Sequence, residues 1–317
     1  MVASRILHAA VMDTEPPALL RATPHDLSTA RALQRRHRAG ALVRLAQGVY
    51  VDAAVWQQLV PHPRHLLLAR AIAPAVRQGA AFSHTTAALV LGWPVIDAPP
   101  ERVHLVDPRT RRTEHRARVV RHAGLPVTES PPVVLAGVPV TSHLRTALDL
   151  ATTSPPSVAA VAVDHAVRTG TLPIDAFLDA LPVGPCRGSV RARTVAAALD
   201  PQHESVGESY TAVRMVELGV PRPIAQHTFR HPDGTLDRVD FWLPDLGVVV
   251  EFDGRQKYSD PTMLAGRSPA EAVWHEKIRE DRLRSLPCVR TVVRPTWWHL
   301  VDPDRLSALF RQHRVTW

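Results

Sequence analysis

The sequence is poor in cysteine and lysine, and it contains no long uninterrupted apolar run. Its two cysteines, Cys186 and Cys288, lie far apart and match no metal or redox spacing. No window approaches the roughly 18 apolar residues that a spanning helix needs, and the first residues lack the layout of a signal peptide. These absences argue against a disulfide scaffold and a membrane protein. We expect a protein of the reducing cytoplasm.

Lysine is nearly absent, because only Lys257 and Lys277 are lysines among the 38 basic residues. Arginine elsewhere is typical of a GC-rich coding sequence and says little about function. The net charge is +8, and the surplus lies in residues 1–203, with 22 basic and 14 acidic side chains, whereas residues 204–317 hold 16 of each. A basic surplus favours a polyanionic partner such as nucleic acid. Colloidal solubility is the alternative explanation.

Residues 20–55 predict a winged helix-turn-helix. Apolar residues follow helical spacing from Leu27 to His37, and Gly40 ends the helix. The segments 42–45 and 48–51 then form two short strands, a wing. A basic helix followed by a small hairpin suits a helix in the major groove. The candidate DNA-binding residues are Arg31, Arg35, Arg36, Arg38 and Arg44. The alternative is a small structural domain with a solvated arginine face.

Residues 61–200 predict a mixed α/β domain. We expect helices at 63–77, 83–92, 142–152, 157–168 and 190–199, and strands near 101–106, 117–121 and 137–140. The segment Pro201-Gln202-His203 marks the boundary before the last domain. The fold class is therefore multidomain α/β: a winged helix-turn-helix over 1–60, a mixed α/β middle domain over 61–200, and an α/β domain over 204–317.

The hairpin of the last domain predicts its own register. Two apolar-rich runs, 236–243 and 247–253, flank a turn. If Asp245 and Leu246 are the two loop residues of this turn, each residue of the first run faces the residue of the second run whose number brings the sum of the two to 491. One face is then wholly apolar, with Val239, Phe241, Leu243, Val248, Val250 and Phe252. The other face carries Arg238, Asp240, Trp242, Val249, Glu251 and Asp253. The apolar face should pack on a core, while the other face carries the candidate functional side chains.

In this register Asp240 lies opposite Glu251. Carboxylates on directly opposed residues repel, so they need a shared proton or a bridging cation. Magnesium favours oxygen ligands and commonly takes one or two protein carboxylates, so Asp240 and Glu251 are the candidate Mg²⁺ ligands. The same register places Arg238 opposite Asp253 and predicts an ion pair between them. The alternative is that these carboxylates merely face solvent.

Two family resemblances cover most of the chain. Residues 20–55 with 80–151, including Gly48-Val49-Tyr50-Val51, Ser83-His84 and 141–146, look like the AbiEi-type antitoxins of type IV toxin–antitoxin systems. Residues 204–317, with Glu251-Phe252-Asp253-Gly254, resemble the very-short-patch-repair-like branch of the PD-(D/E)XK nucleases. The first resemblance implies a cognate toxin as partner. The second implies a restriction-endonuclease-like fold that cleaves DNA.

The chain departs from the general nuclease pattern, because Asp253 stands where the superfamily has a lysine. Asp253 is therefore auxiliary, and the water-orienting lysine must be Lys257 or Lys277. Lys257 is favoured, because Lys277 has a partner four residues on in Asp281. The resemblance also makes Glu208 an auxiliary acid, although Ser205 and Glu208 equally fit a capping box. The helix expected at 270–286 would bury Trp274, Ile278 and Leu286.

These features predict a DNA-binding protein with a magnesium-dependent DNA endonuclease domain. The alternative is a non-catalytic, antitoxin-like transcriptional repressor that binds its own promoter. A pocket where Asp240, Glu251 and one lysine converge would favour the enzyme. A lysine that points away would favour the repressor.

Overall fold

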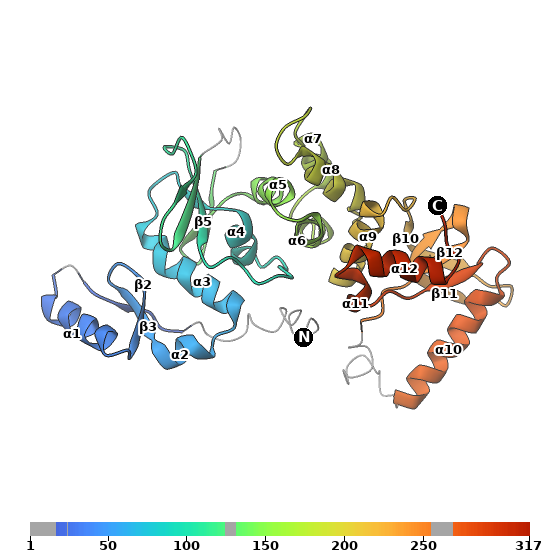
Figure 1. The fold of residues 1–317 in the computed structure, drawn as a ribbon, viewed down its shortest axis with the longest axis horizontal. Coiled ribbons are helices and arrows are strands. Elements are labelled where there is room, and N and C mark those ends of the chain that lie inside the picture. Colours follow the sequence, from blue (N-terminus) through green and yellow to red (C-terminus); the bar gives the residue numbers. More distant parts are fainter. Residues whose placement is uncertain (1–16, 24, 124–130, 255–268) are drawn as a thin grey trace. The chain divides into compact units, whose positions relative to one another are not determined.

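The computed structural model describes residues 17–23, 25–123, 131–254 and 269–317. Helices alternate with mixed sheets, so the chain is a multidomain α/β protein (Figure 1). It divides into two compact units. Among the described residues, those up to 154 and 172–180 belong to the amino-terminal unit, and those in 155–171 and from 181 onward belong to the carboxy-terminal unit. The segment 61–200 is thus shared between the units, and from residue 17 onward the chain passes from one unit to the other three times.

The amino-terminal unit begins with a helix and a hairpin where the sequence predicts them. Helix α1 (Leu27–Arg38) precedes strands β2 (Leu42–Ala46) and β3 (Val49–Asp52), and β1 (Leu20–Arg21) adds a third strand in the order β1-β3-β2. Gly48 turns the hairpin with φ +69°, a conformation that glycine adopts without steric cost. Leu33, Leu42 and Tyr50 form the small core between helix and hairpin.

The rest of this unit is built on a six-stranded mixed sheet with the strand order β6-β7-β5-β4-β9-β8. Its strands are β4 (Ala81–Phe82), β5 (Val103–Asp107), β6 (Glu114–His115), β7 (Val119–Ala123), β8 (Val133–Leu135) and β9 (Val138–Val140). Its helices are α2 (Ala53–Gln58), α3 (Pro61–Ile72), the 3-10 turn η2 (Ala73–Ala75), α4 (His84–Val90), α5 (His143–Thr153) and α7 (Ile174–Asp179). One apolar cluster joins Val51 of the hairpin to Leu67 of α3 and Phe82 of the sheet.

The carboxy-terminal unit is built on a four-stranded sheet in the order β10-β11-β12-β13, antiparallel except for the last pair. The strands are β10 (Ile224–Arg230), β11 (Leu236–Leu243), β12 (Val248–Val250) and β13 (Thr291–Val293), with the 3-10 turn η3 (Pro244–Leu246) between β11 and β12. The helices are α6 (Pro156–Arg168), α8 (Ser189–Ala198), α9 (Val206–Glu217), α10 (Pro269–Ser285), α11 (Trp297–Leu300) and α12 (Pro303–Gln312). The core of the unit therefore runs α9-β10-β11-β12-α10-β13.

The hairpin register predicted from the sequence is confirmed. Phe241 pairs with Val250, and the next two pairs continue the same register to the turn. The predicted apolar face is buried throughout, but Trp242 and Val249 on the opposite face are buried as well, in a cluster with Leu283 of α10. The sheet is therefore covered on both faces beside the turn, and the polar residues of this hairpin face, Arg238, Asp240 and Glu251, lie farther from the turn.

The buried side predicted for the helix at 270–286 (α10) is wrong for Trp274 and Ile278, whereas Leu286 packs against the core cluster as predicted. Trp274 is 60% exposed and Ile278 is 37% exposed, whereas Leu283 is fully buried. A helix of 17 residues is about 25 Å long, and its first half projects past the short strands of the sheet (Figure 1). Only the later turns pack on the sheet, so an apolar period there does not imply burial along the whole helix.

Across the described ranges, we find no helix with the length and apolar content needed to span a bilayer.

Candidate functional site

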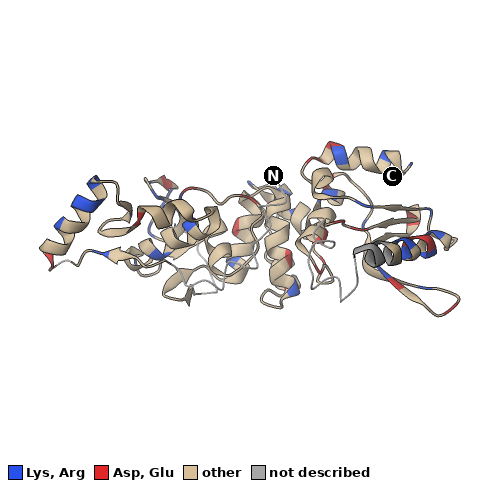
Figure 2. Ribbon diagram, turned by 90° about the horizontal axis from the view of Figure 1, so that it is seen from below, with Lys and Arg blue, Asp and Glu red and all other residues tan. Residues whose placement is uncertain are grey.

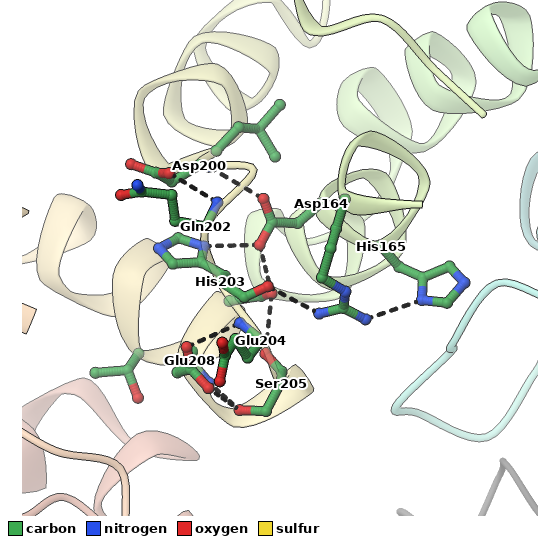
Figure 3. A network of polar contacts seen from close by, with 12 residues as sticks. Asp164, His165, Asp200, Gln202, His203, Glu204, Ser205 and Glu208 are labelled. Carbon is green, nitrogen blue, oxygen red and sulfur yellow. Dashed lines mark hydrogen bonds and ion pairs between the residues drawn. The ribbon is translucent and has the colours of Figure 1, made fainter. Parts of the chain in front are cut away.

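A buried polar network fixes the start of α9, the helix that carries Glu208 (Figure 3). Asp164 of α6 accepts hydrogen bonds from His203 Nδ1 at 2.7 Å, Ser209 Oγ at 2.5 Å and the backbone N–H of Asp200 at 3.1 Å. Asp164 and His203 are both almost fully buried. Because a buried carboxylate without such donors is costly, these bonds tie the loop before α9 firmly to α6.

Glu208 caps its own helix and also faces the sheet. Ser205 Oγ accepts from the Glu208 backbone N–H at 3.2 Å, and the Glu208 carboxylate accepts from Ser205 Oγ at 2.6 Å and from the Glu204 N–H at 2.9 Å. Ser205 is therefore the N-cap, as predicted, but the Glu208 carboxylate accepts from the Glu204 N–H and the Ser205 hydroxyl, whereas a capping box uses the Ser205 N–H. The same carboxylate accepts a 2.7 Å hydrogen bond from Gln226 Nε2 on β10, so the cap is linked to the sheet.

Three polar residues lie in a row across the sheet. The neighbours of Gln226 pair with the neighbours of Asp240, which places Gln226 opposite Asp240. One step beyond the β11–β12 ladder, the register places Asp240 opposite Glu251. Asp240 Oδ2 also accepts a 2.8 Å hydrogen bond from the backbone N–H of Phe252. Asp240 on β11 and Glu251, the residue after β12, thus both lie next to the last pair of the ladder, Phe241–Val250.

Two arginines neutralise Glu251. Arg279 of α10 contacts both carboxylate oxygens, with Nη1 3.4 Å from Oε2, and it also donates to the Arg238 carbonyl at 2.8 Å. Arg294, just after β13, lies 3.2 Å from Oε2 and 3.4 Å from a Glu280 oxygen. Glu251 is only 8% exposed. A buried carboxylate needs compensation of this kind. In this arrangement, guanidinium groups supply the positive charge that a metal ion would otherwise provide.

The ion pair predicted between Arg238 and Asp253 is wrong. Arg238 pairs with Glu204, at 2.8 and 2.9 Å. The reason is that β12 leaves β11 at this point: the Phe252 N–H donates to the Asp240 carboxylate, and the Asp253 N–H donates to the Pro295 carbonyl at 2.9 Å. Cross-strand neighbours no longer exist there.

Of the two candidate lysines, only Lys277 lies among the described residues. Lys277 is exposed on α10, two residues before Arg279. Residues two apart on a helix do not share a face, so Lys277 points to a different side than Arg279, which reaches Glu251. Lys257 lies outside the described residues.

Gly207 allows α9 to approach the motif closely. A Cβ atom at Gly207 would lie 2.1 Å from the ring of Phe252, the residue between Glu251 and Asp253. The Phe252 ring also packs edge-on against Trp297 of α11, with ring centroids 5.0 Å apart. Only glycine fits at this point, and the contact holds the acidic segment against the helix.

The arginines of the first helix are exposed, and basic residues recur along its length (Figure 2). Helix α1 contains no acidic residue and buries only Leu33. Its N-cap Asp26 accepts from the Thr29 hydroxyl and N–H, and these bonds lower the pKa of Asp26 to about 2. Exposed candidate DNA contacts are Arg31, Arg35, Arg36 and Arg38 on α1 and Arg44 on β2.

A second polar cluster, in the amino-terminal unit, joins His84, His104 and His122. His104 Nδ1 lies 3.1 Å from His122 Nε2, and the ring of His84 stacks on that of His122 with centroids 4.0 Å apart. Burial lowers the pKa of all three rings, that of His104 to about 4. Burial also raises the pKa of the adjacent Asp149 to about 6.

Sequence reasoning missed Gln226, the two arginines on Glu251 and the histidine cluster. Gln226 has a φ of +50°, and the pattern of apolar residues in the sequence does not reveal such a backbone conformation. The pairing of Gln226 with Asp240 could be predicted only once the register between β10 and β11 was known. The arginines and the histidines come from segments far apart in the chain, and no local spacing connects them.

No protein-family model matches the chain. Two proteins of Mycobacterium tuberculosis, "Uncharacterized protein MT2308" of strain CDC 1551 and "Uncharacterized protein Rv2248" of strain H37Rv, are each 28% identical to it over 127 residues. The match covers 40% of this chain and 43% of each relative. The crystal structure of the Rv2827c protein of the same species is similar over 73% of this chain and 89% of that chain, at 16% identity and a TM-score of 0.37.

Proposed function

We propose that this protein binds DNA and hydrolyses its phosphodiester bonds with magnesium held by Asp240 and Glu251. The observation that carries the proposal is that both carboxylates directly adjoin the last pair of the β11–β12 ladder, Phe241–Val250, in a register that continues to Asp240 and Glu251. Gln226 and, through it, Glu208 extend the polar row to α9. The element order α9-β10-β11-β12-α10-β13 suits the restriction-endonuclease-like fold implied by the resemblance.

The residues present fit a magnesium ion. The ion prefers carboxylate oxygen and keeps several waters, and two carboxylates are offered by adjacent strands. Glu251 is already paired with two guanidinium groups, so a magnesium ion would have to replace Arg279 at this carboxylate. When bound, magnesium lowers the pKa of water and neutralises the charge on a phosphodiester under attack.

The chain's own groups divide the remaining tasks. Arg279 contacts Glu251 from α10, and with a metal ion on that carboxylate it would be beside the site as a positive charge for a phosphate. Lys257, which follows the acidic motif by four residues from Asp253, is the proposed water-orienting group, because Lys277 faces another side of α10. Glu208 orients Gln226 and through it the sheet edge next to Asp240.

DNA binding is assigned to the amino-terminal helix and hairpin, which suit a winged helix-turn-helix. Four exposed arginines without an intervening acid make α1 a candidate for the major groove. Arg44 lies on the hairpin that would form the wing. Phosphate contacts of this kind add affinity without sequence preference, so the partner class is DNA and the target sequence stays open.

The second candidate is a repressor of the antitoxin class, with a cognate toxin as partner. The observation that favours it is the engagement of both Glu251 oxygens by arginine, since an ion-pair cluster of this kind can be purely structural. The orientation of Lys277 points the same way. In that case the carboxy-terminal unit would hold the fold together and cleave nothing.

The test is cleavage of supercoiled, linear, single-stranded and mismatched DNA with and without magnesium, for the parent and the Asp240→Asn variant. We expect magnesium-dependent cleavage by the parent and none by the variant. Asparagine keeps an oxygen that can accept from the Phe252 N–H, so the metal-free variant should melt no lower than the parent. Asp281→Asn, on the exposed side of α10, serves as the matched control.

The repressor reading leads if three results occur together: the parent cleaves no DNA, magnesium leaves its melting temperature unchanged, and it binds its own promoter. An ion bound only to the native state must raise the melting temperature with concentration. Lys257→Ala and Lys277→Ala then separate the lysines, and an inactive Lys277 variant beside an active Lys257 variant would reverse their assignment.

A further inference from the structure

The three histidines of the amino-terminal unit come from adjacent segments of one sheet. His84 begins α4, directly after β4, whereas His104 lies on β5 and His122 on β7. These strands are neighbours in the order β7-β5-β4. The backbone N–H of Ser83 donates to the His104 carbonyl at 2.9 Å. The sheet itself therefore holds the three side chains together.

The ring nitrogens lie within reach of one ion. One nitrogen from each histidine falls within 4.8 Å of the others, and the His104–His122 pair is at 3.1 Å. Three imidazole nitrogens bound tetrahedrally at the usual zinc distance are about 3.3 Å apart. The His104–His122 pair already has about this spacing, and the His84 nitrogen, within 4.8 Å of the others, would have to move closer when an ion binds.

The surroundings of His84 show two features that the protein fold alone does not explain. His84 has φ +53° although it is not glycine, and such an outlier is costly and concentrates at functional sites. Asp149 Oδ2, 3.7 Å from His84 Nδ1, is buried and has no partner in hydrogen-bonding geometry, although the His84 backbone N–H also acts to lower the pKa of this carboxyl. The other oxygen, Oδ1, accepts from Arg145 Nε at 2.7 Å, which aims the free oxygen at His84.

We propose that His84, His104 and His122 bind one divalent transition-metal ion of the zinc class, with Asp149 as the carboxylate that orients His84. Three neutral imidazoles suit zinc or cobalt and do not suit magnesium, which prefers oxygen. Metal-bound histidines usually direct their second ring nitrogen to a carboxylate or another acceptor. The Nδ1 of His84 faces Asp149 and lies 2.9 Å from Ser83 Oγ, so its Nε2 is left for the metal.

The competing explanation is a hydrogen-bonded structural cluster. A single proton between His104 and His122 would satisfy both rings without an ion. That explanation leaves the buried Asp149 oxygen unpaired and the strained His84 backbone without a purpose. A bound cation accounts for both features. It polarises His84 toward the Asp149 carboxylate, and the free energy of metal binding offsets the cost of the strained His84 backbone.

The site is separate from the one assigned to DNA cleavage, and the test keeps the two apart. Cobalt(II) is titrated into the full chain while its visible absorption is recorded, because tetrahedral nitrogen ligation gives intense bands and octahedral oxygen ligation gives weak ones. We expect one equivalent with an intense band that zinc abolishes by displacement. The bands should be lost in His104→Gln and His122→Gln, and retained in His115→Ala, whose histidine is exposed on the neighbouring strand β6.

Two further variants complete the test. Asp149→Asn should weaken cobalt binding about 10- to 100-fold, the usual effect of losing a carboxylate behind a ligand. Asp240→Asn should leave the band unchanged, whatever its effect on cleavage. The proposal is overturned if the parent shows no intense band at one equivalent, a result that needs no variant to fold. It is equally overturned if folded His104→Gln and His122→Gln proteins both keep the band.

Discussion

Removing the Arg279 guanidinium tests whether Glu251 is available to a metal ion. At an effective dielectric constant of 20, opposite charges about 4 Å apart attract by roughly 4 kcal/mol. Arg279 is partly exposed, with a side-chain exposure of 24%, and Arg294 stays on the same carboxylate. Because Arg279 competes with magnesium for Glu251, we expect its replacement by alanine to favour magnesium binding by about a third of that attraction, ~1.4 kcal/mol. Magnesium binding should tighten about tenfold.

The assay is thermal melting over a series of magnesium concentrations. In Arg279→Ala, the rise in melting temperature should begin at about one tenth of the concentration that the parent requires. The metal-free variant should melt lower than the parent, because a nearly buried carboxylate loses one of its two compensating charges. Arg284→Ala is the matched control, since Arg284 lies on the same helix and pairs with Glu280 instead. Equal magnesium dependence in the two variants would show that the guanidinium and the ion do not share Glu251, and the proposed metal site would fail.

Four other perturbations follow from the structure. Replacing Arg35 and Arg36 by alanine should reduce the slope of log affinity against log salt by about 0.9 for each lost phosphate contact, and an unchanged slope would remove α1 from the DNA interface. Gly207→Ala should lower the melting temperature although alanine favours helices by about 1 kcal/mol, because its Cβ would overlap the Phe252 ring; a higher melting temperature would contradict the close contact. Asp164→Ala should cost about 3–5 kcal/mol of unfolding free energy, against about 0.5 or less for the exposed Asp281→Ala, as denaturant titration will show. Burial lowers the pKa of His65 to about 4 from the ordinary 6.5, with His62 adding a smaller repulsion. The unfolded chain therefore takes up a proton first as pH falls from 6.5 to 4, and the native state loses up to about 3 kcal/mol over that window; His65→Gln should flatten this part of the stability–pH curve, and an unaltered curve would be evidence against the assignment.

The local elements were predictable because their signals are local. The turn at Asp245 and Leu246 and the strict alternation on both sides predicted the β11–β12 register, which the structure confirms. The helix and hairpin of residues 27–52 follow from helical spacing and Gly48 in the same way. Each of these signals fits within about twenty residues, so one sequence suffices to read it.

The contents of the sites were less predictable because they depend on distant segments. Arg279 and Arg294 reach Glu251 from 28 and 43 residues away in the chain, and both looked like ordinary surface arginines. The expected burial of Trp274 failed for a related reason, since the extent of the neighbouring sheet decides which turns of α10 are covered. The spacing of apolar residues predicts which side of a helix is apolar, but it does not predict how much of that side another element covers.

The three crossings of the chain between its units restrict how the protein can be divided. A cut after residue 203, where the sequence suggests a domain boundary, would separate Asp164 from Ser209 and remove the buried hydrogen bond between them. A cut at residue 155 would instead leave α7 without the unit to which it belongs. No single break in the backbone yields two complete folding units. Recombination between related genes can therefore exchange either half intact only by joining at several positions at once, so the two units are expected to be inherited together.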